Sequence, residues 1–182
     1  AQWQLIKKRK PEQLLYFASG ANSAGDILGL AKSGHPAGIS ALHVAGKSMA
    51  RDRAQEALKR AADAGLPLFV DSGAYSAYRA GKPITPAQWK AILGLYLDLA
   101  KRYGDYLYVV APDVIADQTA TLGLLERYAP QIDAVAAYGA HMLIGMQRGP
   151  LSLTDFYYAA YRALGQGLGG VWDRPLVPAI PY

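Results

Sequence analysis

The sequence predicts an α/β protein made of repeated β/α units, arranged as a TIM-type barrel. Short apolar runs alternate with longer stretches of helical periodicity along the chain. These runs are too uniformly apolar to keep one face in water, which is typical of parallel strands buried on both sides. Small groups of polar residues follow several runs, as they do where many strand ends meet at the mouth of a barrel. A doubly wound sheet is less well supported, because neither GxGxxG nor GxxxxGK[ST] occurs.

The first half of the chain contains three expected strands and two expected helices. In order they are strand 14–18 (LLYFA), helix 23–32, strand 38–44 (GISALHV), helix 51–64 and strand 67–70 (PLFV). The second strand is expected from its small and β-branched residues. The helix at 51–64 places Ala54, Leu58 and Ala61 on one face, and Gly65 ends it.

The second half continues the same alternation. In order, the expected elements are helix 85–103, strand 106–110 (YLYVV), helix 118–128, a short apolar stretch at 132–137, strand 141–146 (HMLIGM), helix 154–164 and strand 176–180 (LVPAI). Thr85 is a favourable N-cap and Pro86 is favourable at the first helical position, so the start of the helix at 85 is well defined. Gly104 ends this helix.

The chain length predicts one domain. Its 182 residues can bury about two-thirds of the unfolded surface around a single core, and we expect residues 1–182 to form one (β/α) barrel-type domain. Six expected strands fall short of the usual eight in about 250 residues, and the sequence stops directly after the last of them. We therefore expect an incomplete barrel, either a truncated product or one that a partner chain or a second copy completes.

The composition excludes several classes of protein. Hydrophobic residues make up 52% of the chain and charged residues 18%, which is a globular rather than a disordered composition. No run approaches the ~20 apolar residues of a membrane helix and no signal peptide is recognisable, so we expect a cytoplasmic protein without membrane contact. The absence of cysteine excludes disulfides and a thiolate zinc site. The net charge of +5 favours a polyanionic partner such as nucleic acid.

Two aspartates follow buried strands and are the first candidates for a functional site. Asp71 comes directly after the third strand, and Asp113 follows the fourth strand after Pro112. Because an unpaired buried charge is costly, both side chains should project from the strand ends. Two carboxylates that face one pocket can bind the N–H groups of a heterocycle or act as acid and base. Asp71 and Ser72 would equally fit an ordinary helix cap.

Five other residues near these strand ends are candidates for ligand contacts. Ser72 and Gly73 allow a tight turn after the first aspartate, and Tyr75 offers an aromatic face nearby. After the fifth strand, the amide of Gln147 can both donate and accept hydrogen bonds, which suits the edge of a purine. Gly149 permits close approach of the backbone.

No metal or organic cofactor is expected. The three histidines, His35, His43 and His141, are far apart in the chain and lack the HxH or HExxH spacing of metal ligands. His43 and His141 fall in strand-like runs and are expected to be hydrogen-bonded residues of the core or the rim. No GxSxG motif for a nucleophilic serine is present.

Three short motifs, VDSGAYS (70–76), APDV (111–114) and GMQRG (145–149), resemble the tRNA-guanine transglycosylase superfamily when taken in this order. Within it, they resemble the divergent branch found with phage and DNA-modification systems. The likeness covers residues 66–182. It implies a barrel whose strand ends bind guanine or a 7-deazaguanine, and an activity that exchanges this base in tRNA or DNA.

The resemblance also implies a role for individual residues. Asp71 would be the active-site aspartate that contacts the base, with the next two residues beside it. Tyr75 would take the position of the aromatic ring that stacks on the base. Asp113 would bind the amino and ring N–H edge of the base, and Gln147 would contact its carbonyl side.

The sequence departs from this family in two ways. The family's nucleophilic aspartate lies on a later strand than the last one here, and the cysteine-rich zinc site of the tRNA-acting enzymes is absent. Two other functions therefore stay open. One is a non-catalytic module that binds nucleobases or nucleic acid. The other is a different barrel enzyme, such as a glycoside hydrolase that uses Asp71 and Asp113 as paired carboxylates.

Overall fold

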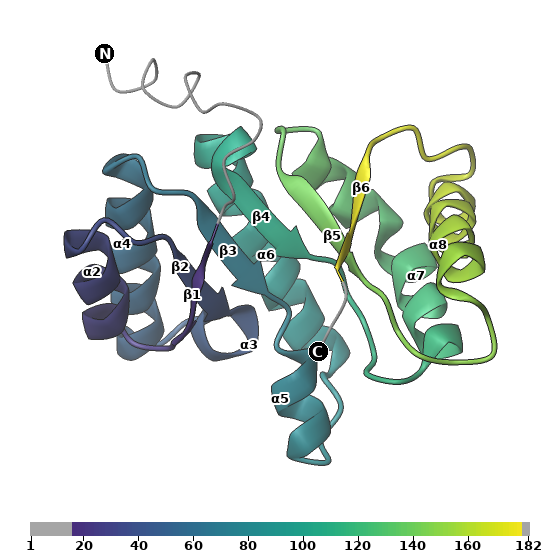
Figure 1. The fold of residues 1–182 in the computed structure, drawn as a ribbon, viewed down its shortest axis with the longest axis horizontal. Helices are drawn as coiled ribbons and strands as arrows, with labels where there is room; N and C mark the ends of the chain where they lie inside the picture. The colour runs from purple at the N-terminus through teal and green to yellow at the C-terminus, as the bar shows by residue number, and fades with distance from the viewer. Residues whose placement is uncertain (1–15, 180–182) are drawn as a thin grey trace.

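Six parallel strands form a single sheet in the computed structural model, which describes residues 16–179 (Figure 1). The strands are β1 (Ala18–Ala21), β2 (Ala37–Ser40), β3 (Leu68–Asp71), β4 (Leu107–Val110), β5 (His141–Gly145) and β6 (Leu176–Ala179). They lie in the sheet in the order of the sequence, so each strand pairs with the next one along the chain. The edge strands β1 and β6 are not paired with each other, so the sheet is open and not closed into a barrel.

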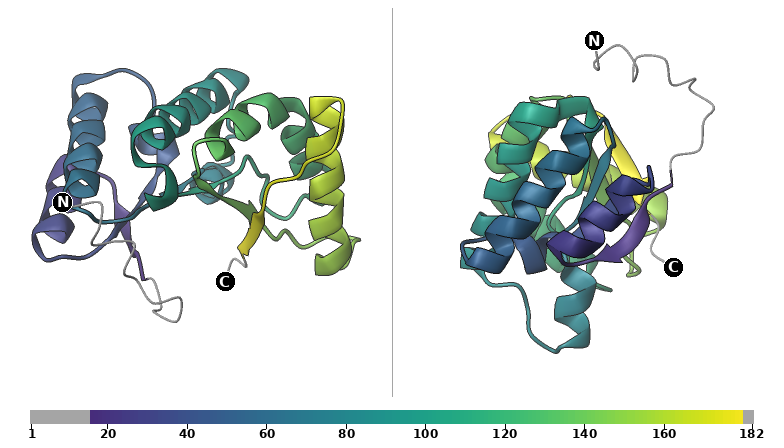
Figure 2. Two further views of the ribbon diagram at one scale, coloured as in Figure 1. Left: turned by 90° about the horizontal axis from the view of Figure 1, so that it is seen from above. Right: turned by 90° about the vertical axis from the view of Figure 1, so that its left-hand side faces the viewer.

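The long helices between these strands lie on one side of the sheet (Figure 2, left). They are α2 (Ala24–Lys32), α4 (Met49–Asp63), α6 (Pro86–Tyr103), α7 (Gln118–Ala136) and α8 (Leu153–Leu168). Right-handed crossovers between strands that follow one another in a sheet place every helix on the same face. The shorter helices α3 (Ala41–Val44) and α5 (Ala74–Arg79) follow β2 and β3, and a 3-10 turn, η1 (Gly104–Tyr106), precedes β4.

The core lies between the sheet and this layer of helices. Alternate residues of a strand point to opposite faces, and in the central strands Leu68, Val70, Leu107 and Val109 are fully buried. The helices contribute fully buried side chains to the same cluster, among them Ile27, Leu58, Tyr96, Leu125 and Phe156. This packing sets the register of the strands and so aligns their carboxyl ends along one edge of the sheet.

The opposite face of the sheet carries a row of aromatic rings. Phe69, Tyr108 and His141 are register neighbours across the three central strands. The rings of Tyr108 and His141 stack with their centroids 4.3 Å apart. Phe17 contacts both Phe69 and Tyr108, with centroid distances of 5.5 and 5.4 Å. These ring contacts join neighbouring strands on the face that the long helices do not cover.

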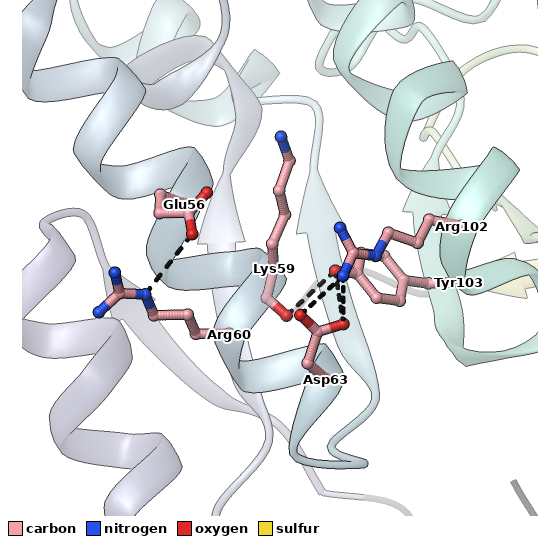
Figure 3. Close-up of polar contacts among 6 residues, drawn as sticks. All are labelled: Glu56, Lys59, Arg60, Asp63, Arg102 and Tyr103. Atoms are coloured by element: carbon pink, nitrogen blue, oxygen red, sulfur yellow. Dashed lines mark hydrogen bonds and ion pairs between the residues drawn. The ribbon is translucent and has the colours of Figure 1, made fainter.

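A polar contact on the surface joins α4 to α6 (Figure 3). Arg102 donates from Nη2 to the two carboxylate oxygens of Asp63, at 2.9 and 3.0 Å, and the Tyr103 hydroxyl donates to Asp63 Oδ1 and to the Lys59 carbonyl, each at 3.1 Å. The side chains of Arg102 and Asp63 are 59% and 47% exposed, so their ion pair contributes no more than about 1 kcal/mol. These groups satisfy one another, and we assign them a structural role.

Two tyrosines of α8 hydrogen-bond to the backbone of the edge strand β6. The carbonyl of Leu176 accepts from the Tyr157 hydroxyl at 2.6 Å, and the Leu176 N–H donates to the Tyr161 hydroxyl at 3.2 Å. In the same strand, Pro178 has no N–H to offer. A further strand added beside β6 would therefore have to displace both hydroxyls from Leu176.

The bounds of two expected strands are wrong. The strand expected at 14–18 is β1, which begins at Ala18 and includes Ser19 and Gly20; residues 14 and 15 lie outside the described residues. The strand expected at 38–44 ends at Ser40, because residues 41–44 turn into α3. Alanine and leucine favour a helix, so this apolar run changes conformation halfway. His43 consequently lies in a short helix and not in a strand.

The helices also differ from expectation in three places. α7 is continuous through Pro130, although the sequence predicts a helix at 118–128 and a separate stretch at 132–137. Leu125 and Ile132 are fully buried on either side of the proline, so packing outweighs the lost backbone hydrogen bond. α8 continues beyond its expected end at 164, and the short helix α5 is not predicted. The other expected elements are confirmed to within two residues.

Among the helices of residues 16–179, none has the length and apolar character that crossing a bilayer requires.

Candidate functional site

The carboxyl ends of β3, β4 and β5 bring four polar side chains to one edge of the sheet. Asp71 is the last residue of β3 and Ser72 follows it, Asp113 follows β4, and Gln147 follows β5. Three of these side chains belong to buried residues: Ser72 is 1% exposed, Gln147 2% and Asp113 6%. Binding sites of parallel α/β folds are built at this edge, because the loops that follow the strands meet there.

Asp113 is held by hydrogen bonds to both of its carboxyl oxygens. Oδ1 accepts from the Ser72 hydroxyl at 2.7 Å, and Oδ2 accepts from the side-chain N–H of Gln147 at 2.9 Å. The Ser72 hydroxyl in turn accepts from the backbone N–H of Ala74 at 3.1 Å. A carboxylate offers about four acceptor positions. Asp113 therefore has a fixed orientation and still has acceptor positions for a ligand.

Gln147 is fixed by its own hydrogen bonds. Its Oε1 accepts from the backbone N–H of Ala116, and its carbonyl accepts from the side chain of Gln118, both at 2.9 Å. Ala116 has a φ of 58°, a left-handed conformation that costs a non-glycine residue roughly 1–2 kcal/mol. Gln118 also donates to the carbonyl of Leu151 at 3.0 Å and accepts from its N–H at 2.8 Å. The loops after β4 and β5 are thus joined through the two glutamines.

Two glycines leave room for this network. A Cβ on Gly145 would lie 3.1 Å from both Asp113 Oδ2 and Gln147 Nε2. Gly149, a ligand contact in the sequence-based prediction, lies against Gln118, where a Cβ would come within 2.5 Å of Oε1. In this structure Gly149 therefore serves the packing of Gln118.

Asp71 lies beside the network and has different contacts. Its Oδ2 accepts from the backbone N–H of Gly73 at 3.0 Å, which closes a tight turn after β3. Gly73 has a φ of +87°, and a Cβ there would collide with Leu42 and lie 2.7 Å from Ser40 Oγ. Glycine is the residue that fits both the left-handed conformation and the close contact with β2 and α3.

Burial raises the pKa of both carboxyl groups. The pKa of Asp113 is raised to about 7, chiefly by removal from water; the hydrogen bond from Ser72 opposes this shift and the charge of Asp71 adds to it. Removal from water also raises the pKa of Asp71, against the effect of the backbone N–H groups of Gly73 and Ser72. A pair of neighbouring carboxyl groups, one of which changes charge near neutral pH, is typical of functional sites.

Tyr96 of α6 supports the strand ends from the helix layer. Its side chain is fully buried, and its hydroxyl lies 3.3 Å from the carbonyl of Val70 and 3.1 Å from that of Val110, to which it donates. Burial, followed by the charges of Asp71 and Asp113, holds the pKa of Tyr96 well above its usual value. The hydroxyl therefore stays protonated and bridges the carboxyl ends of β3 and β4.

A cavity of about 380 Å³ opens beside Asp113, between α5 and the loop that follows β4. Its wall is mostly apolar, with Ile84 and Trp89 among the lining residues, and Tyr78 and Lys82 contribute polar groups. This volume lies within the usual range for small-molecule sites. A larger hollow of about 560 Å³ lies along α8, and another of about 380 Å³ lies between α2 and α4. The cavity beside Asp113 is the one of these three at the carboxyl ends of the strands, so we place the candidate site there.

Tyr75 does not line the cavity beside Asp113, although the family resemblance implies a stacking role for it. It lies in the first turn of α5 and is 58% exposed. Tyr78, one turn further on, is the α5 tyrosine in the cavity wall. The structure thus brings together Asp71, Ser72, Gly73, Asp113 and Gln147, places Gly149 against Gln118 and leaves Tyr75 on the surface.

The histidines are separate from this site. His141 lies in β5, where Nε2 is 3.1 Å from the carbonyl of Asp105 and the ring stacks on Tyr108. His43 lies in α3. In the part of the chain that the structure describes, no three His, Cys, Asp or Glu side chains are grouped so that they could hold a metal ion.

Sequence reasoning missed three residues of the site: Ser40, Tyr96 and Gln118. Tyr96 is part of the apolar face of α6, and its hydroxyl gives no separate signal in the sequence. Gln118 is the first residue of α7, where a glutamine is unremarkable, and its partners are backbone groups of a distant loop. Ser40 falls within a run that the sequence predicts as a continuous strand.

Comparison with known protein families, with curated proteins and with solved structures found no match to this chain.

Proposed function

We propose that this protein binds a guanine-type base, guanine or a 7-deazaguanine, at the carboxyl ends of β3 to β5, as the base-binding part of a base-exchange transglycosylase. The observation that carries the proposal is the fixed pair of Asp113 and Gln147, 2.9 Å apart, with Asp71 beside it. These are the three residues to which the resemblance of the sequence motifs assigns contacts with the base.

The pair is complementary to guanine. One edge of guanine carries N–H donors at N1 and at the 2-amino group, followed by the O6 acceptor. The unused acceptor positions of Asp113 suit the two donors, and the second N–H of the Gln147 amide suits O6. Adenine has no N1–H and carries an amino group in place of O6, so the same pair discriminates against it. Asp71 would contact the base from the neighbouring strand.

The order of the strands supports the finer proposal that the sheet is part of a TIM-type barrel. Strands that follow one another around a barrel, with all long helices outside, have the arrangement seen from β1 to β6. The strand-end position of the carboxylates is also the position of barrel active sites. We propose that the described residues form six consecutive units of such a barrel.

In base exchange, the glycosidic bond to the outgoing guanine breaks, a carboxylate holds the sugar covalently, and the incoming base then displaces that carboxylate. The resemblance assigns the covalent step to an aspartate on a later strand. In this proposal, the described residues therefore bind and orient the base, and the nucleophile comes from outside them. The net charge of +5 supports DNA or tRNA as the polymer that carries the guanine.

Calorimetric titration tests the base site directly. We expect guanine and a 7-deazaguanine to bind the wild-type protein saturably, and adenine not to bind. Asp113→Ala should weaken binding at least tenfold, whereas Asp98→Ala, which removes an exposed acid of α6, should leave it unchanged. A folded wild-type protein that binds neither guanine nor the deazaguanine would overturn the proposal.

The two carboxyl groups also favour a second candidate function. A neutral acid beside an ionised one is the arrangement that glycoside hydrolases use, and the raised pKa of Asp113 suits the acid. Sugar binding without purine binding would support this alternative. Purine binding without incorporation of labelled guanine into DNA or tRNA would indicate a non-catalytic module.

A further inference from the structure

Ser40 has a buried hydroxyl without a hydrogen-bond partner. Among the buried side-chain N and O atoms of residues 16–179, Ser40 Oγ is the one that lacks a partner. Ser40 is also the N-cap residue of α3, yet its side chain makes no capping hydrogen bond. A serine at this position usually accepts from a backbone N–H of the first helical turn. A buried polar group that is left unpaired is costly, so this serine needs an explanation.

The neighbour that can satisfy Ser40 is Asp71. The two residues are register partners in β2 and β3, so their side chains leave the sheet on the same face. The strands of a sheet are about 4.8 Å apart, and rotation about one Cα–Cβ bond brings a serine hydroxyl and an aspartate carboxyl of such a pair into contact. In this structure Asp71 Oδ2 accepts from the backbone N–H of Gly73, and the backbone N–H of Ser72 is a second donor to this carboxylate. A carboxylate offers about four acceptor positions, so it can also accept from Ser40.

A ligand cannot easily reach the hydroxyl itself. Ser40 Oγ has almost no accessible surface, and the backbone of Gly73 lies directly against it, since a Cβ on Gly73 would be 2.7 Å away. The partner must therefore be a group that is already next to Ser40. Asp71 has acceptor positions beyond those used by the two backbone N–H groups, and it is the residue that the proposed function places against the base.

We propose that Ser40 is a positioning residue for Asp71, an inference that rests on the proposed function. In the structure described here, Asp71 accepts from Gly73 and the Ser40 hydroxyl is unpaired. When a guanine-type base binds, Asp71 turns, takes a hydrogen bond from Ser40 and is held in the orientation that contacts the base. Binding of the base is favoured because the Ser40 hydroxyl has a hydrogen-bond partner in the bound arrangement and none in the arrangement without the base.

Substitutions at Ser40 test this inference by pairing a stability measurement with a binding measurement. Ser40→Ala removes the unpaired hydroxyl, so its Tm without ligand should equal or exceed that of the wild type, while its affinity for guanine falls three- to tenfold. Ser40→Thr keeps the hydroxyl and should bind guanine within twofold of the wild type. Ser33→Ala is the matched control, because its hydroxyl bonds to Gly29 at the exposed end of α2; its affinity should be unchanged.

Each outcome separates this inference from the proposed function. If the wild type binds guanine and Ser40→Ala binds it equally well, the role of Ser40 is wrong and the base site stands. A Ser40→Ala protein that is less stable than the wild type, or that fails to fold, shows that the hydroxyl has a partner in the free protein and overturns the inference. If the wild type binds no base, the proposed function and the role of Ser40 both fall.

Discussion

The side-chain amide of Gln147 donates a 2.9 Å hydrogen bond to Asp113 Oδ2 and so joins the carboxyl ends of β4 and β5. The amide cannot turn away, because its oxygen accepts from the backbone N–H of Ala116. Gly145 lies next to both side chains, and because it has no Cβ, nothing pushes Asp113 and Gln147 apart. The pair is therefore organised before a ligand arrives, which reduces the entropy lost on binding.

Replacing Gln147 with methionine should destabilise the protein by about 2–6 kcal/mol. The substitution keeps the length of the side chain but leaves Asp113 Oδ2 and the Ala116 N–H without partners, each at a cost of roughly 1–3 kcal/mol. Urea denaturation at pH 7.5 measures the loss. Gln131→Met, on the exposed surface of α7, is the control and should change stability by less than about 0.5 kcal/mol. Equal effects of the two substitutions would contradict the network described here.

The stability of the wild type should fall as the pH rises from 5 to 8, in comparison with Asp113→Asn. The pKa of Asp113 is raised from 3.8 to about 7 in the folded protein. At pH 5 to 7 the unfolded carboxyl is ionised while the folded one holds its proton, so the folded state binds more protons and loses stability with rising pH. The expected difference between the two proteins over this range is on the order of 3 kcal/mol.

Denaturant titrations at several pH values measure this dependence. Asp71 has a raised pKa in both proteins, so its contribution cancels to a first approximation and the difference reports on Asp113. Asp98→Asn removes an exposed acid and should follow the pH dependence of the wild type. If the free energy of unfolding depends on pH in the same way for the wild type and Asp113→Asn, the carboxyl of Asp113 is ionised in the folded protein over the whole range from pH 5 to 8.

The strands and the acidic residues of the site could be predicted because burial leaves a strong pattern in the sequence. A parallel strand covered on both faces needs uniformly apolar residues, and a charged residue that follows it, such as Asp71 or Asp113, stands out. The change from β2 to α3 could not be predicted, since a short apolar run such as 38–44 fits a strand and a helical turn equally well. Whether the sheet closes was also beyond the local pattern, because closure depends on which strands pair and not on any one strand.

The supporting residues of the site were not predictable for a different reason. Gln118, Tyr96 and Ser40 act through contacts with residues that are distant in the sequence or through backbone atoms, which carry no residue-specific signal. Tyr75 shows the converse. An aromatic residue close to Asp71 in sequence is expected near the site, but the first turn of α5 points it into solvent.

Gly73→Ala should destabilise the protein by about 3 kcal/mol or more. Alanine at a φ of +87° costs roughly 1–2 kcal/mol for the left-handed conformation alone, and its Cβ would also collide with Leu42. Gly81→Ala separates these two effects, because Gly81 has a φ of +62° and no atom within 4 Å of a built Cβ. The Gly81→Ala protein should therefore lose only the roughly 1–2 kcal/mol of stability that the left-handed conformation costs an alanine. Thermal and urea denaturation of both variants provide the comparison, and equal losses would show that the collision at Gly73 is relieved by movement of α3.

Tyr96→Phe should lower the free energy of unfolding by about 1–2 kcal/mol, although it removes a single oxygen atom. The ring stays in its buried place, but the carbonyls of Val70 and Val110 lose the donor that bridges them. The control is Tyr138→Phe, whose side chain is 49% exposed, and it should be close to neutral. Guanine affinity, measured on the same proteins, should fall with Tyr96→Phe and not with Tyr138→Phe, because Val70 and Val110 lie at the strand ends that carry Asp71 and Asp113. A Tyr96→Phe protein with wild-type stability would mean that those carbonyls are satisfied without the tyrosine, and that α6 does not hold the two strand ends together.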